Sequence, residues 1–154
     1  MQVFKGKFYL SFILLFMAAC FIATDIEAAN IWPTASANVC WTITADGGGS
    51  GVLRLRSMPM GSGNYLISGK MVVGGKIVEV INGNAITSMS DVKLTLNSAG
   101  RNTGEAMWSS TYYVVLSGTT LNGTFEYIGH DRSYVDLSVD TEYGKGTLTK
   151  ITCP

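Results

Sequence analysis

One acidic stretch near the C-terminal end carries side chains that could bind a cation. Asp136, Asp140 and Glu142 stand at even spacings around Ser138, so on an extended backbone all four share one face. Three carboxylates and a hydroxyl are hard oxygen ligands of the kind that Ca²⁺ takes, but the glycine of an EF-hand loop is missing. A solvated strand shows the same alternation. We therefore predict no metal site, and Asp136, Asp140 and Glu142 are the candidates for one.

A second group of polar residues surrounds the single histidine, His130. Asp131 follows it directly, and adjacent side chains of an extended chain point apart, so the two do not fit a hydrolytic triad. No Gly-x-Ser-x-Gly turn presents a nucleophile. Glu126 and Asp131 are the carboxylates that could meet for glycoside cleavage. Since a nucleophile, a base and a stabilising donor do not come together, we predict a protein that is not an enzyme and has no cofactor. His130 and Arg132 are expected to cap the strand end or to bond to loop carbonyls.

The aromatic residues give the strongest indication of a binding site. Trp108, Ser110 and Tyr112 alternate along the apolar run 105–116, so they share one face of an extended segment. Two large rings beside a hydroxyl are typical of a small-molecule pocket. We predict that Trp108 faces the interior and that these three residues bind a small apolar molecule. The alternative is an interior filled by side chains.

The surrounding segments have the two-residue period of β-strands. Leu53 and Leu55 alternate with Arg54 and Arg56, and no window after residue 38 has the apolar spacing of a helix. The fold class is therefore all-β. The predicted strands are 39–45, 51–57, 64–73, 76–82, 91–97, 105–116, 120–128 and 143–152, with 84–89 unassigned and a short strand conceivable at 134–139.

Turn signals separate these segments and indicate their order in space. Gly74-Gly75, Asn82-Gly83 and Asn122-Gly123 are typical of tight hairpins, which pair strands that are neighbours in sequence. An antiparallel up-and-down meander of about eight strands loses both edges when it closes into a barrel. We predict such a barrel. The alternative is a β-sandwich, to which the long connection 129–142 would lend itself.

The N-terminus has the layout of an export signal. Lys5 and Lys7 precede the uncharged apolar run 8–17, and the apolar character ends before Asp25. We expect a signal peptide at 1–28, although small residues at 35–37 offer a second place for cleavage.

A third possibility is lipid attachment. Met17-Ala18-Ala19-Cys20 resembles a bacterial lipobox, which would make Cys20 the lipidated first residue of the mature protein. We therefore expect a secreted or periplasmic protein, with a lipid anchor at Cys20 as the alternative.

The two remaining cysteines also favour export. Cys40 and Cys153 bracket the mature domain, and in an oxidising compartment such a pair is most simply a disulfide. The expected organisation is a signal at 1–28, a short N-terminal segment at 29–38 and one β-barrel domain at 39–154.

Charge excludes two classes of partner. Eleven basic residues balance eleven acidic ones, which leaves no overall positive charge for nucleic acid and none for an anionic membrane. Membrane attachment is expected only through Cys20.

The predicted architecture resembles a known group of small secreted barrels. A meander with Trp41 in its first strand and Gly123-Thr124-Phe125 near its end is similar to the calycins, the lipocalin and avidin type of barrel. Val39 replaces the glycine of the lipocalin Gly-x-Trp pattern. This resemblance implies a barrel that holds one small apolar molecule. The alternative function is a structural or protein-interaction module of the cell envelope with a filled core.

Overall fold

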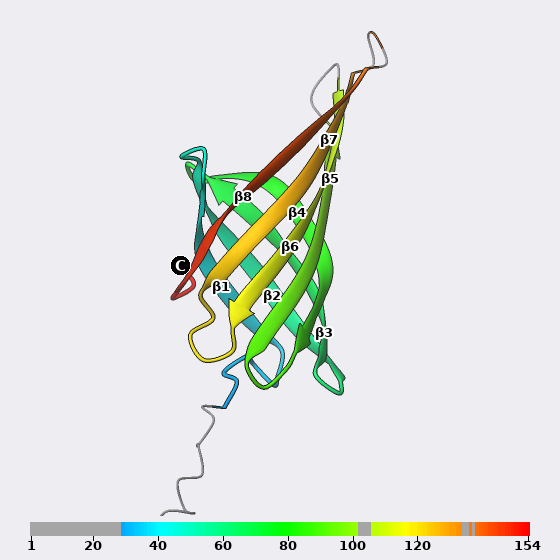
Figure 1. The fold of residues 1–154 in the computed structure, drawn as a ribbon. Coiled ribbons are helices and arrows are strands. Elements are labelled where there is room, and N and C mark those ends of the chain that lie inside the picture. Colours follow the sequence, from blue (N-terminus) through cyan, green and yellow to red (C-terminus); the bar gives the residue numbers. More distant parts are fainter. Residues whose placement is uncertain (1–28, 102–105, 134–135, 137) are drawn as a thin grey trace, which may run out of the picture.

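The computed structural model describes residues 29–101, 106–133, 136 and 138–154, and this part of the chain folds as an eight-stranded antiparallel β-barrel (Figure 1). The described residues include no helix that is long and apolar enough to cross a bilayer. The strands are β1 (Ala37–Ala45), β2 (Ser50–Gly61), β3 (Asn64–Val73), β4 (Lys76–Thr87), β5 (Asp91–Arg101), β6 (Ala106–Ser117), β7 (Gly123–Ser133) and β8 (Val139–Ile151).

The topology confirms the predicted meander. Every strand pairs with its neighbours in sequence, and β1 pairs with β8 to close the barrel, so the sandwich alternative is wrong. The β1–β8 ladder is the shortest of the eight, and it runs only from Cys40–Ile151 to Ala45–Gly146. Cys40 and Cys153 form the predicted disulfide beside it, with Cα atoms 5.1 Å apart.

Several strands are longer than the sequence indicated. The predicted connection 129–142 is largely strand, because Gly129 to Ser133 belong to β7 and Val139 to Glu142 belong to β8. Polar residues such as these are typical of loops, which is why a connection was predicted here. A strand that projects beyond the barrel, however, can be polar on both faces. Figure 1 shows this projection, a tall wall at one side of the barrel formed by the far ends of β5 to β8.

The turn predicted at Asn82-Gly83 is also wrong, since both residues lie within β4. Glycine is needed there for a different reason. A Cβ at Gly83 would collide with the backbone carbonyl of Thr95 on β5, so glycine permits the close approach of two coiled strands.

One end of the barrel, which we call the closed end, is sealed by the segment before β1. Trp32 is 3% exposed; its ring stacks on Trp41 at 6.2 Å and meets Tyr65 edge-on at 6.0 Å. The indole N–H of Trp32 donates to Ser57 Oγ, and the indole N–H of Trp41 donates to the Leu121 carbonyl. Residues 29–36, part of the N-terminal segment 29–38 for which no role was predicted, thus plug the barrel.

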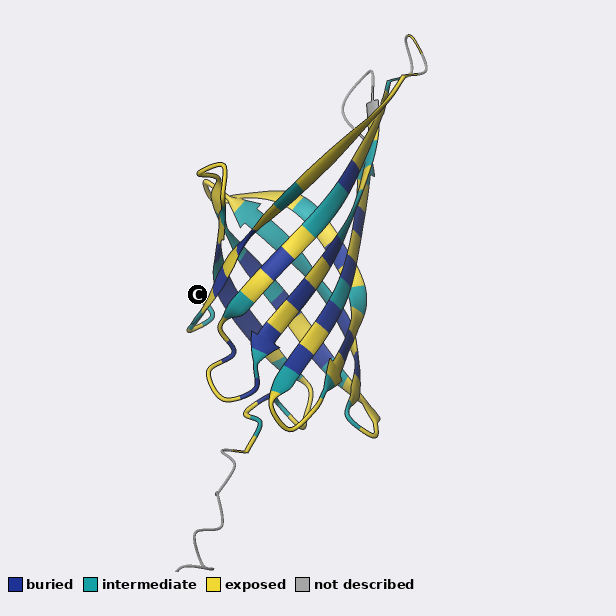
Figure 2. Cartoon of the chain, in the orientation of Figure 1, coloured by how far each residue is buried: buried dark blue, intermediate teal, exposed yellow. Residues whose placement is uncertain are grey.

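The interior above this plug is a filled apolar core. Figure 2 shows buried positions alternating with exposed ones along the strands that surround it. Inward positions of the strands carry Leu, Ile, Val and aromatic side chains, and the space left among them is about 10 Å³, lined only by apolar residues and Tyr112. Such a space is no larger than one water molecule requires. The lower interior therefore has no room for a ligand.

Candidate functional site

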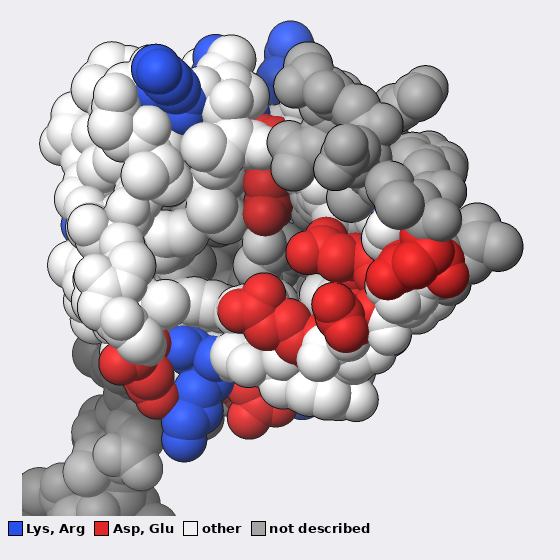
Figure 3. Space-filling view, turned by 90° about the horizontal axis from the view of Figure 1, so that it is seen from above, with Lys and Arg blue, Asp and Glu red and all other residues white. Residues whose placement is uncertain are grey.

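The opposite end of the barrel contains a cavity of about 410 Å³, which we call the open-end cavity. It lies on the concave side of the projecting wall, above the apolar core. Figure 3 looks down on this end and shows carboxylates gathered beside the hollow. The residues that line the cavity are Glu79, Trp108, Ser110, Tyr112, Tyr127, Gly129, His130, Asp131, Asp140, Thr141 and Glu142.

Two glycines leave the space that the rings of the cavity occupy. Gly100 on β5 lies opposite Trp108 on β6, and a Cβ at Gly100 would collide with the indole. Gly144 on β8 lies opposite Tyr127 on β7, and a Cβ there would collide with the phenol ring. Each ring therefore lies flat across a neighbouring strand, an arrangement in which an aromatic side chain covers a strand glycine.

The floor of the cavity is a hydrogen-bonded group around Glu79. The Tyr112 hydroxyl donates to both carboxylate oxygens of Glu79 at 2.8 Å, and Ser98 Oγ donates to Oε2 at 3.0 Å. Burial of Tyr112, followed by the charge of Glu79, raises the pKa of the phenol far above its usual value. Tyr112 therefore stays a neutral donor, and Glu79 is held in place as its acceptor.

A second tyrosine and carboxylate lie beside the first pair. The Tyr127 hydroxyl donates to Glu142 Oε1 at 2.8 Å, and the Tyr112 and Tyr127 rings are 5.6 Å apart. Burial and the hydrogen bond to Glu142 raise the pKa of Tyr127. The two neighbouring phenols, whose ring planes are tilted by 32°, thus each hold one carboxylate in the lining of the open-end cavity.

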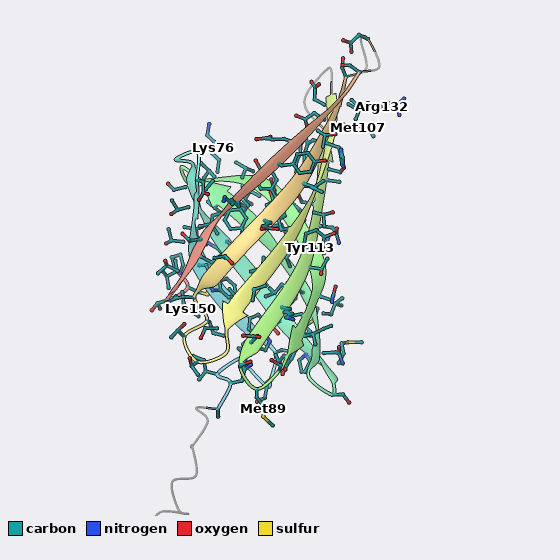
Figure 4. The ribbon with its side chains drawn as sticks, viewed as in Figure 1. Lys76, Met89, Met107, Tyr113, Arg132 and Lys150 are labelled. Carbon is teal, nitrogen blue, oxygen red and sulfur yellow. A yellow bond between two sulfur atoms is a disulfide. The ribbon has the colours of Figure 1, made fainter. Side chains whose placement is uncertain are left out.

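The structure brings together the three residues predicted to bind a ligand. Trp108, Ser110 and Tyr112 all line the open-end cavity, and Trp108 faces inward as predicted. The outer face of β6 carries the exposed side chains of Met107 and Tyr113, both labelled in Figure 4. The period of two therefore assigned each side chain of this strand to the correct face.

Sequence reasoning missed Glu79 and Tyr127, the other two members of the floor. Glu79 is the one carboxylate in the apolar segment 76–82. A lone acidic residue two positions before the inward Ile81 is a signal that could have been used. Tyr127 lies two residues after Phe125 on the inward side of β7. Its place beside Tyr112 depends on strand pairing and could not be read from one segment.

The acidic stretch proposed as a cation ligand set is divided in the structure. Asp140 and Glu142 line the open-end cavity, whereas Asp136 belongs to the connection between β7 and β8. The backbone N–H and the hydroxyl of Ser138 donate to Asp136 and lower its pKa to about 2. Within the described residues no group of three His, Cys, Asp or Glu side chains converges as a metal would require.

The residues weighed for catalysis do not converge either. Glu126 lines a groove on the outer face of β6 to β8, while Asp131 lines the open-end cavity, so the two carboxylates lie on opposite sides of the sheet. His130 is not at a strand end, where the sequence led us to expect it. It lies within β7, and its Nδ1 is 3.1 Å from Thr141 Oγ1 on β8.

Comparison with known protein families, with curated proteins and with solved structures finds no match to this chain. The resemblance to calycins consequently stands on architecture alone, a closed barrel of eight antiparallel strands.

Proposed function

We propose that this protein binds a small molecule in the open-end cavity and does no chemistry on it. The observation that carries the proposal is the contrast between a core with about 10 Å³ of free space and a cavity of about 410 Å³ directly above it. Small-molecule sites have volumes of roughly 300–1,000 Å³, with aromatic walls and a few fixed polar groups. The open-end cavity has all three properties.

The position of the filled core limits where the ligand lies. The apolar part of a ligand would rest on Trp108, Tyr112 and Tyr127, because no space continues below them. The remainder would face the carboxylates of the wall. The ligand is therefore still expected to have an apolar body, and we propose that this body lies against these rings and not deep in the barrel.

The alternative role, a protein-interaction module, has less support. Such a module would show a continuous apolar patch on its outer surface. Leu66, Val80 and Ile86 are exposed on β3 and β4, but Ser68, Asn82 and Asn84 lie among them in the register of these strands. The other exposed apolar residues of this hairpin, Val73, Ile77 and Val78, lie at its tip. Exposed apolar residues are in themselves ordinary on a protein surface.

The site of action would be outside the cytoplasm. The disulfide is compatible with a secreted or periplasmic location, and the predicted signal at 1–28 lies outside the described residues. A cut after residue 28 keeps Trp32 in the closed end, whereas a cut after residue 37 would remove it. We therefore propose the first cut for simple secretion. The alternative lipid attachment site, Cys20, also lies outside the described residues.

Native mass spectrometry of the protein from its own source tests binding. We expect a small molecule to stay bound to the wild type and to be lost from Trp108→Ala. Tyr113→Ala, which removes a ring from the outer face of the same strand, is the matched control and should retain it. A wild-type mass equal to that of the chain alone, together with no binding to a chemically diverse fragment library in NMR spectra, would contradict the proposed function.

A further inference from the structure

We propose that the ligand of the open-end cavity is an organic cation, an amine or quaternary ammonium ion attached to an aromatic or apolar body. This inference rests on the proposed function and names the class of molecule. Its charged group would lie between Glu79 and Glu142, and its body against Trp108.

The distribution of charge is the first step. The chain as a whole is neutral, with eleven basic and eleven acidic residues. The lining of the open-end cavity nevertheless contains Glu79, Asp131, Asp140 and Glu142, and no Lys or Arg among its described residues. A cleft lined by one sign of charge concentrates the field and attracts ions of the opposite sign. Figure 3 shows this local excess of carboxylates.

The order of the carboxylates is the second step. Glu79 accepts hydrogen bonds from Tyr112 and Ser98, and Glu142 accepts one from Tyr127. These neutral donors fix the carboxylates in position but do not neutralise them. The two carboxylates are thus already held in position before a ligand binds. A bound cation would balance their negative charge.

The aromatic rings decide between kinds of cation. A bare metal ion needs several ligands that converge on one point, and the described His, Cys, Asp and Glu side chains form no such group. An organic cation spreads its charge over a larger volume and is also attracted to the faces of Trp and Tyr. Trp108 and Tyr127 line the same cavity as the carboxylates, and its volume of about 410 Å³ fits such a molecule.

The test uses three probes with one aromatic body and different charges. These are 2-phenylethylammonium, neutral 2-phenylethanol and anionic 3-phenylpropionate. Binding is measured by NMR titration at low salt and again at high salt, on the disulfide-bonded domain from residue 29 to the end. We expect the cation to bind at least tenfold more tightly than the alcohol, the acid to bind more weakly still, and the cation to lose affinity with salt.

Matched variants locate the charge. Glu79→Gln combined with Glu142→Gln keeps the side-chain shape and one acceptor oxygen in each residue but removes two charges. This double variant should weaken cation binding at least tenfold while leaving the affinity for the alcohol unchanged. Glu126→Gln removes a carboxylate from the outer face of β7 and should leave both affinities unchanged. Circular dichroism and the melting temperature of each variant report whether it is folded. If the double variant does not fold, Glu142→Gln alone replaces it, with an expected loss of about threefold.

The possible results separate this inference from the proposed function. If the alcohol or the acid binds as tightly as the amine, the inference is overturned and small-molecule binding stands. If none of the probes binds, or if Ca²⁺ alone binds and is lost in the double variant, the inference is likewise overturned. In those cases the native mass spectrum still decides the proposed function. If the co-purified molecule is neutral, the proposed function is supported and the inference that the ligand is a cation is contradicted.

Discussion

The two ends of this barrel are built from the same eight strands and the same alternation of side chains, yet one end is sealed and the other is hollow. At the closed end Trp41 is 0% exposed, stacks on Trp32 and donates its N–H to a backbone carbonyl. At the open end Trp108 is half-buried and covers Gly100 at the edge of a cavity. An identical residue type thus serves packing at one end and lines a cavity at the other.

The difference arises from what stands opposite each ring. Large side chains surround Trp41, and the segment with Trp32 adds a further ring from outside the sheet. Glycines stand opposite Trp108 and Tyr127, and the remaining inward positions near them carry serine or carboxylates. Small residues create volume, and charged residues keep that volume hydrated, so the open end cannot collapse into the core. The comparison teaches that one barrel can have a filled core at one end and a cavity large enough for a ligand at the other.

The largest effect on stability is expected from a substitution at the closed end that leaves the open end unchanged. Trp41→Ala should lower the free energy of unfolding by about 3–5 kcal/mol, the usual result for a buried Trp. Trp108→Ala should cost less than half as much, because one side of its ring faces the cavity. Urea unfolding followed by circular dichroism measures both. Equal losses would show that Trp108 is part of the packed core and that the two ends do not differ as described.

The next effect concerns the seam between β1 and β8. Cys40→Ser with Cys153→Ser removes the disulfide, whose cysteines are 113 residues apart. Loops of this length give an upper estimate of ~4.7 kcal/mol, and native disulfides typically contribute about 2–4 kcal/mol, so we expect a loss in that range. Hydrogen exchange should lose protection at the short β1–β8 ladder and retain it at the middle of the β6–β7 ladder. Uniform loss along both ladders would contradict a locally weakened seam.

The smallest effect sharpens the boundary between core and cavity. Tyr112→Phe removes the donor to Glu79 and should cost about 1 kcal/mol at neutral pH. The folded pKa of Tyr112 is raised, so the stability linked to its proton is fully present below the unfolded value near 10 and is lost as the pH rises above it. The gap in stability between wild type and Tyr112→Phe should therefore narrow above pH 10. Urea unfolding at neutral pH and at about pH 11 checks this, and a gap that stays constant would contradict a protonated Tyr112 at the cavity floor.

Much of the fold followed from the sequence because its signals are local. The period of two and the Gly-Gly and glycine-rich turns act within or between adjacent segments. Together with Cys40 and Cys153 at the two ends of the domain, they were enough to predict an all-β meander closed into a barrel. The same local rule placed Trp108, Ser110 and Tyr112 on one inward face. The turn rule failed at Asn82-Gly83. There the glycine allows two neighbouring strands to approach closely, which cannot be seen in the sequence of either strand alone.

The remaining features of the site were decided only by the tertiary structure. Glu79, Tyr112, Tyr127 and Glu142 come from four strands, and their meeting depends on the stagger of those strands around the barrel. The sequence likewise left open whether the interior was filled or hollow. The volume of the interior depends on all the side chains that face one another across the barrel. Strand register decides which glycine lies opposite which ring, and the sequence of one strand does not contain that register.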